Sequence, residues 1–149
     1  MTSRNVRLEP HRVLLVDDNH FGNLARKAAL QELGLAVETA LSGEEAFEVF
    51  LRCPFDVVVT DFRMPGMSGT ELISRIRESG HPTRTILLTA WSVLGFTEES
   101  TGADAVLWKC GKETEQLQRT VRQLLMRRAN RKPVQSEERQ RVAGVARSG

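Results

Sequence analysis

The segment Val13-Leu14-Leu15-Val16-Asp17-Asp18 joins four consecutive aliphatic residues to a pair of carboxylates. A short, continuous apolar run of this kind is typical of a strand that is buried on both faces of a parallel sheet. Comparable runs recur at residues 35–40, 55–60, 85–89 and 105–108. The run at 35–40 is more mixed in polarity than the others, which predicts an edge strand.

The segments between these runs carry apolar residues at helical spacing. The predicted stripes are Phe21, Leu24, Ala25 and Ala28, then Ala46, Phe47, Val49 and Phe50, then Leu72, Ile73 and Ile76, and finally Leu117, Val121, Leu124 and Leu125. Ser42 and Glu45 match a capping box before the second helix, and Gly34 is a stop signal after the first. Residues 91–101 show no clear helical spacing of apolar residues and contain Gly95. Five strands that alternate with five helices predict an α/β domain with a doubly wound, five-stranded parallel sheet.

The chain has 149 residues and a net charge of +2, and this charge is unevenly distributed along it. Residues 126–149 carry a net charge of +5 and residues 1–125 a net charge of −3. We expect an N-terminal extension over residues 1–10, one domain over residues 11–128, and a basic, flexible tail over residues 129–149. The tail is too short to fold as a DNA-binding domain, so nucleic acid is an unlikely partner.

Several classes of protein do not fit this composition. No segment approaches the roughly twenty apolar residues that span a bilayer, and the first twelve residues contain no apolar signal region. Two cysteines, Cys53 and Cys110, are too few for a disulfide framework, and the three histidines have no zinc-type spacing. We therefore expect a cytoplasmic protein with no membrane partner.

Polar residues follow four of the predicted strands where each strand ends. Asp17 and Asp18 follow the first, Asp61 the third and Thr89 the fourth, and the fifth runs into Lys109. In an order 2-1-3-4-5 these ends meet at one edge, where doubly wound sheets bind ligands. Each residue alone is more often a turn former, a helix cap or a solvated surface group. Five of them at four strand ends indicate a functional site.

The chemistry of that site follows from its charges. Three converging carboxylates repel one another unless a cation or protons intervene, and Mg²⁺ prefers oxygen ligands of this kind. A lysine and a hydroxyl beside them can hold a phosphoryl group. The pattern indicates attack by a carboxylate on phosphorus to give an aspartyl phosphate.

Over about residues 11–128 the sequence resembles the receiver domains of two-component response regulators. The resemblance rests on Val13 to Asn19, on Asp61-Phe62-Arg63-Met64-Pro65-Gly66-Met67-Ser68-Gly69, on Leu87-Leu88-Thr89-Ala90, and on Gly102-Ala103-Asp104 followed by Lys109. It implies the flavodoxin-like fold with strand order 2-1-3-4-5. It also implies a signalling protein that catalyses only its own phosphorylation and dephosphorylation.

The resemblance also assigns roles within the site. Asp61 would accept a phosphoryl group from a histidine kinase or phosphotransfer protein. Asp18, Asp61 and the backbone carbonyl of Arg63 would ligate Mg²⁺, with Asp17 acting largely through a water. Thr89 and Lys109 would hold the phosphoryl oxygens. Movement of Thr89 would then reshape the face formed by helix four, strand five and helix five, which binds a downstream partner.

The chain departs from the family pattern on this output side. Val106 stands where the family usually has Tyr or Phe, so Trp108, which shares its strand parity, either replaces that aromatic residue or packs on helix five. Cys110 stands in place of a proline that follows a cis bond, so we expect a trans bond there. The interval before Gly102 is short, so helix four should be short, shifted or mobile. Arg63 and Trp91 should flank the site mouth and slow the loss of the phosphoryl group.

Three functions remain open from the sequence. The first is a single-domain response regulator, either monomeric or dimeric after phosphorylation. The second is a receiver-like scaffold that binds a partner without phosphorylation. The third is a phosphatase or phosphotransferase for small molecules, which is disfavoured because Arg63 stands where a second catalytic acid would be needed. The basic run at residues 127–132 could contact nucleic acid or an acidic partner through non-specific electrostatics, or it could be a solvated helix end.

Overall fold

The computed structural model describes residues 9–90 and 97–129. Trp91, Gly95 and nearly all of the predicted extension and tail lie outside these ranges. The elements in chain order are β1 (Arg12–Val16), α1 (His20–Gln31), β2 (Ala36–Ala40), α2 (Gly43–Arg52), β3 (Val57–Asp61), α3 (Gly69–Glu78), β4 (Arg84–Thr89), α4 (Glu98–Thr101), β5 (Ala105–Trp108) and α5 (Glu113–Ala129). No helix in the described parts of the chain is long and apolar enough to cross a membrane.

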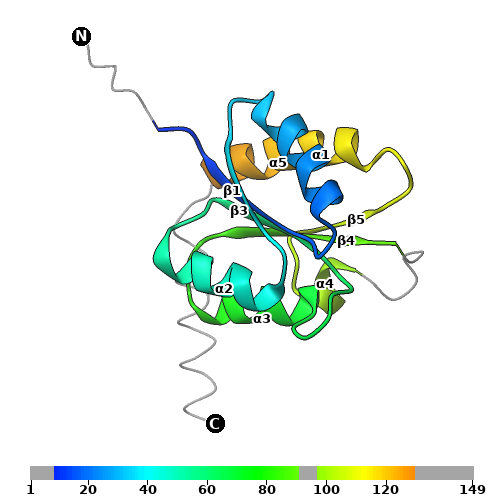
Figure 1. The fold of residues 1–149 in the computed structure, drawn as a ribbon. Coiled ribbons are helices and arrows are strands. Elements are labelled where there is room, and N and C mark those ends of the chain that lie inside the picture. The colour runs from blue at the N-terminus through cyan, green and yellow to red at the C-terminus, as the bar shows by residue number, and fades with distance from the viewer. Residues whose placement is uncertain (1–8, 91–96, 130–149) are drawn as a thin grey trace.

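The five strands form one parallel sheet in the order β2-β1-β3-β4-β5. The doubly wound α/β fold is therefore confirmed, and β2 lies at an edge as its mixed polarity predicted. Helices α1 and α5 cover one face of the sheet, and α2, α3 and α4 cover the other (Figure 1). The order of the strands reverses between β1 and β3, and ligands bind such folds at that point.

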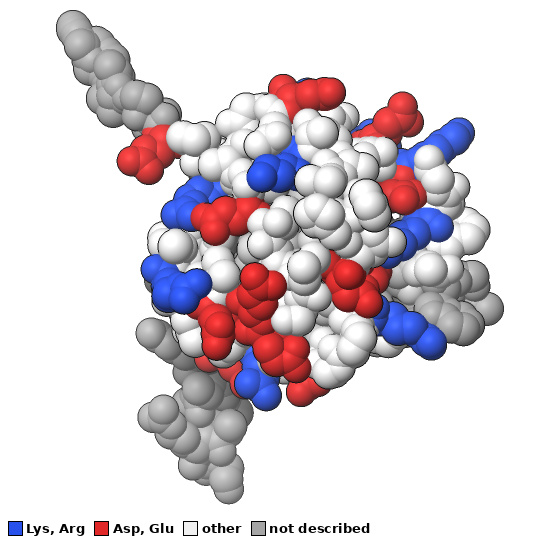
Figure 2. All heavy atoms as spheres, in the orientation of Figure 1, with Lys and Arg blue, Asp and Glu red and all other residues white. Residues whose placement is uncertain are grey.

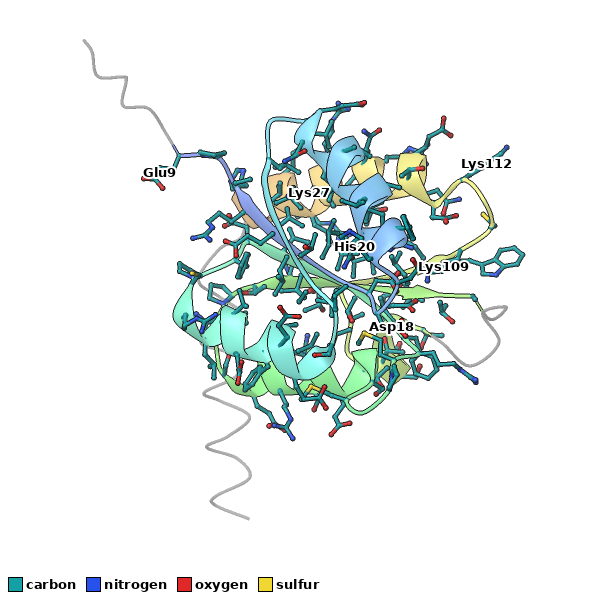
Figure 3. All side chains as sticks on the ribbon, viewed as in Figure 1. Glu9, Asp18, His20, Lys27, Lys109 and Lys112 are labelled. Atoms are coloured by element: carbon teal, nitrogen blue, oxygen red, sulfur yellow. The ribbon has the colours of Figure 1, made fainter. Side chains whose placement is uncertain are left out.

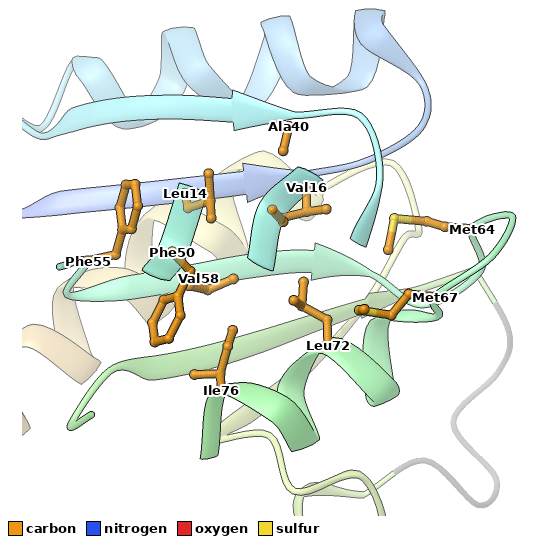
Figure 4. Packing of buried hydrophobic residues seen from close by; sticks show 11 residues of the cluster. Leu14, Val16, Ala40, Phe50, Phe55, Val58, Met64, Met67, Leu72 and Ile76 are labelled. Atoms are coloured by element: carbon orange, nitrogen blue, oxygen red, sulfur yellow. The ribbon is translucent and has the colours of Figure 1, made fainter. Parts of the chain in front are cut away.

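Alternate side chains of each central strand enter different cores. Leu14 and Val16 point from β1 into the cluster beneath α2 and α3, which Figure 4 shows from close by. Val13 and Leu15 point to the opposite face and pack with Leu117 and residues of α1 and α5. Because both faces of β1, β3 and β4 are covered, each of these strands contains at least three consecutive aliphatic residues.

The prediction that the apolar stripe of α1 forms its buried face is wrong. Phe21 is 78% exposed and Leu24 is 47% exposed, and the inner face of the helix carries Asn23, Arg26 and Leu30 instead. Polar side chains occupy this inner face because they bind the ends of neighbouring strands, as described below. The apolar residues are left on the outer surface.

Two helix predictions are refined by the structure. Ser42 caps α2 by accepting a hydrogen bond from Glu45 N–H at 3.0 Å, but the Glu45 carboxylate accepts from Leu41 N–H rather than completing the capping box at Ser42. The described part of α4 is a single turn from Glu98 to Thr101, as the poor patterning predicted.

Candidate functional site

Three carboxylates lie together at the carboxyl edge of the sheet. Asp61 is the last residue of β3, and Asp17 and Asp18 follow β1, which pairs with β3 in parallel register. One oxygen of each lies within 4.8 Å of the others. In Figure 3, Asp18 and Lys109 are labelled close together at this edge, and Figure 2 shows acidic side chains gathered at the same place.

Lys109 lies between two of these carboxylates. Its Nζ is 2.7 Å from Asp61 Oδ1 and 3.6 Å from Asp17 Oδ2. The backbone N–H of Lys109 donates to the carbonyl of Thr89 at 2.8 Å, which ties the loop after β5 to the end of β4. Thr89 is fully buried at that end. The structure thus brings Asp17, Asp18, Asp61 and Lys109 together and places Thr89 at the end of the adjacent strand.

The loop after Asp61 is held by its backbone. Phe62 N–H donates to Leu88 O at 2.8 Å, and Gly69 N–H closes the loop on Phe62 O at 2.9 Å. The carboxylate of Glu44, at the start of α2, accepts a hydrogen bond from Met67 N–H at 2.9 Å. Arg63 is exposed on this loop, two residues after Asp61.

Sequence reasoning missed two side chains of α1 that belong to the site. Arg26 Nη1 donates to Asp17 Oδ2 at 2.8 Å, and both groups are buried. Asn23 Nδ2 donates to the carbonyls of Asp17, at 3.2 Å, and Ala40, at 3.0 Å. Leu30 could have indicated both residues, because Arg26 and Asn23, four and seven positions before it, lie on the same face of the helix.

The surroundings shift the pKa values of the two buried carboxyl groups, Asp17 and Asp61, in opposite directions. Burial alone would raise the pKa of Asp17, but hydrogen bonds from Asn19 N–H and Arg26, together with the charge of Lys109, hold that pKa below its usual value. Burial raises the pKa of Asp61, and the hydrogen bond from Lys109 offsets only part of the rise. The surroundings therefore favour the ionised form of Asp17 and disfavour that of Asp61.

The donor set fits a hard divalent cation. All three candidate side chains offer carboxylate oxygens, which Mg²⁺ prefers, and Mg²⁺ needs few protein ligands because it retains water. Both oxygens of Asp17 already accept hydrogen bonds, from Asn19 N–H and from Arg26. Asp18 and Asp61 are therefore the side chains best placed for direct ligation.

On the output side of the site, one of the two predictions for Trp108 is wrong. Ala105 and Leu107 pack with α5, so Val106 and Trp108 face the opposite side of the sheet. Trp108 is 46% exposed and its Nε1–H donates to Ala90 O at 3.3 Å, so packing on α5 is wrong.

One prediction about the loop after this strand is confirmed. The described chain contains no cis peptide bond, so the bond between Lys109 and Cys110 is trans as predicted. Cys110 and Cys53 are both free thiols.

Comparisons with known sequences identify one family. The model of the response regulator receiver domain matches residues 13–122. The chain is 37% identical over 142 residues to the transcriptional regulatory protein TrcR of Mycobacterium tuberculosis, covering 94% of this chain and 54% of TrcR. It is 31% identical over 121 residues to the transcriptional regulatory protein QseB of Escherichia coli O157:H7, covering 80% of this chain and 54% of QseB. The chain thus spans about half the length of these relatives.

Solved structures give the same fold. The response regulator TrrA of Thermotoga maritima, in complex with Mg²⁺ and BeF, is 36% identical with a TM-score of 0.70, covering 76% of this chain and 98% of that chain. The chemotaxis protein CheY4 of Vibrio cholerae is 29% identical with a TM-score of 0.72, covering 78% of this chain and 99% of that chain.

Proposed function

The chain belongs to the response regulator receiver domain family, and we propose that it signals by accepting a phosphoryl group on Asp61 from a histidine kinase or phosphotransfer protein. The observation that carries this proposal is the ion pair between Lys109 Nζ and Asp61 Oδ1, set beside Asp17 and Asp18. A nucleophilic carboxylate and a fixed ammonium group are thereby held at one point.

The proposed transfer uses Asp61, Lys109 and Thr89. An oxygen of Asp61 forms a bond to phosphorus while the bond from phosphorus to the donor breaks, and the donor keeps that electron pair. In this proposal Lys109, which pairs with Asp61, then binds the phosphoryl oxygens, and Thr89, at the end of the adjacent strand, donates a hydrogen bond to them. Mg²⁺, when bound, neutralises charge on the same oxygens. Asp18, Asp61 and the carbonyl of Arg63 are the proposed ligands.

The outer face of α1 supports a protein as the donor. Phe21 and Leu24 are large apolar residues exposed on the helix that begins two residues after Asp18. Figure 2 shows a largely uncharged surface over α1, next to the acidic edge of the sheet. An apolar surface beside a reactive carboxylate is suited to docking a phosphorylated protein.

The test is phosphorylation by acetyl phosphate, with intact mass as the measurement. Incubation with Mg²⁺ should add one phosphoryl group to the wild-type chain and to Phe21→Ser, because a small donor needs no docking surface. Asp61→Asn and a sample without Mg²⁺ should stay unlabelled. With any histidine kinase that labels the wild type, Phe21→Ser should be labelled at least about tenfold more slowly, since its contact is lost.

Two results would contradict the proposal. Labelling of Asp61→Asn to the wild-type level would move the acceptor to another residue. A chain that neither binds Mg²⁺ nor accepts phosphate from acetyl phosphate or from a panel of kinases would favour the scaffold that binds its partner without phosphorylation.

We further propose that output passes through the face formed by α4, β5 and α5. The bond from Trp108 Nε1–H to Ala90 O spans from β5 to the residue that follows Thr89. A movement of Thr89 toward the phosphoryl group would displace Ala90 and release the indole. Trp108 thereby takes the reporting role that Val106 lacks.

Trp108 fluorescence checks this coupling. In a Trp91→Phe background, phosphorylation should shift the Trp108 emission to shorter wavelength, because the half-exposed indole turns toward the sheet when it is released. Asp61→Asn treated with the same donor is the control. Unchanged emission from fully phosphorylated protein would exclude the role of Trp108.

A further inference from the structure

Arg26 contacts the acidic site from the inner face of α1. The residue is 6% exposed, and its Nη1 donates to Asp17 Oδ2 at 2.8 Å. A Cβ atom on Gly22 would lie 3.0 Å from Asp17 Oδ2 and 3.1 Å from Arg26 Nη1. The glycine one turn earlier therefore makes room for the guanidinium against the carboxylate.

Both oxygens of the Asp17 carboxylate accept hydrogen bonds, one of them from Arg26. Oδ1 accepts from Asn19 N–H at 2.9 Å, and Oδ2 accepts from Arg26 and lies 3.6 Å from Lys109 Nζ. A cation that bound Asp17 directly would have to compete with a buried, charge-assisted hydrogen bond. Asp17 is thus held on the α1 side of the cluster.

The contact also changes the charge of the cluster. Three carboxylates face two fixed cations, Arg26 and Lys109, which leaves one net negative charge. With Lys109 as the sole cation, the net charge would be two negative. A divalent cation is attracted more weakly by the smaller charge, and a phosphoryl dianion is repelled less.

We propose that Arg26 is a positioning residue that acts as an internal counter-cation: it fixes Asp17 and lowers the affinity of the site for Mg²⁺. The inference rests on the proposed function, since it takes Mg²⁺ as the ion of the site. A guanidinium that only anchored α1 would stabilise the fold without setting this affinity. The two roles are therefore separable by measuring ion binding.

The experiment is calorimetric titration of the full chain with Mg²⁺, in the absence of any phosphodonor. Arg26→Met removes the charge from a buried position and should tighten Mg²⁺ binding on the order of tenfold. Arg26→Lys keeps the charge and should stay close to the wild type. Arg52→Met removes the same charge from the end of α2, before β3 begins, and should change the affinity less than about twofold because of distance and screening.

Thermal melts provide a second measurement. The increase in Tm produced by saturating Mg²⁺ should be larger for Arg26→Met than for the wild type, because tighter binding to the folded state gives more stabilisation. If Arg26→Met does not fold, Arg26→Gln decides the question, since it keeps an amide donor for Asp17 and still removes the charge.

Unchanged or weaker Mg²⁺ binding by the folded, neutral variants would overturn the counter-cation role. Equal tightening by Arg26→Lys would also overturn it, because that variant retains the charge. A wild-type chain that binds no Mg²⁺ at all would instead contradict the Mg²⁺-dependent function, so the two failures are distinguishable.

Discussion

Asp17→Asn is expected to lower the free energy of unfolding by about 3 kcal/mol, whereas Asp61→Asn raises it slightly. Asp17 is 2% exposed and pairs with Arg26, which is almost as deeply buried. Removal of one partner of a buried ion pair leaves the other charge without compensation, and such losses are about 3–5 kcal/mol. Asparagine keeps the shape and an acceptor for Asn19 N–H, so the loss should lie at the lower end of this range.

Asp61 differs because its pKa is raised rather than lowered. Burial disfavours its ionised form, and Lys109 compensates only in part. Replacement of the carboxylate by a neutral amide therefore removes a charge that the fold tolerates poorly. The same substitution at two neighbouring carboxylates should thus have opposite effects on stability.

The pH dependence follows from the sign of the Asp17 shift. A carboxyl group with a depressed pKa in the folded state stabilises the fold fully above its unfolded value of about 3.9, and this stabilisation is lost as the pH falls through the folded value. The difference between the wild type and Asp17→Asn should therefore be constant near pH 7 and should shrink below about pH 4. Urea unfolding at a series of pH values measures it. A difference at pH 7 no larger than that of Asp61→Asn would contradict the argument.

The sheet could be predicted from sequence because its strands are buried on both faces. Four aliphatic runs separated by helical segments admit few arrangements, and right-handed crossovers reduce them further. The site followed from the same argument, because residues that end parallel strands meet at one edge. The position of Asp17, Asp61, Thr89 and Lys109 at this edge can therefore be predicted without any knowledge of side-chain contacts.

The inner face of α1 could not be predicted in this way. Apolar periodicity assigns Phe21 and Leu24 to the core, but the structure places Asn23 and Arg26 there. Their burial depends on partners outside the helix, the carbonyl of Ala40 and the carboxylate of Asp17. A buried polar residue is tolerated only with such partners, and a helical pattern does not reveal them.

Gly69→Ala is expected to cost more than about 3 kcal/mol of stability, because its new methyl group would meet main chain rather than a movable side chain. A Cβ at Gly69 would lie 2.2 Å from the carbonyl oxygen of Asp61 and 2.9 Å from Leu87 Cδ1. Insertion of one methyl group into a packed core costs about 1–3 kcal/mol when side chains can adjust. Here the carbonyl belongs to the proposed phosphoacceptor itself, so relief of the clash requires movement of the end of β3.

Gly80→Ala is the matched control for this prediction. No atom lies within 4 Å of a Cβ at Gly80, and its φ of +81° leaves only conformational strain of about 1 kcal/mol. Urea unfolding of both variants separates steric overlap from backbone strain. Phosphorylation by acetyl phosphate should be slowed in folded Gly69→Ala and unchanged in Gly80→Ala, because only the first substitution displaces Asp61. Equal stability of the two variants would show that the loop after Asp61 can yield, and the rigid backbone that we infer around the acceptor would then be wrong.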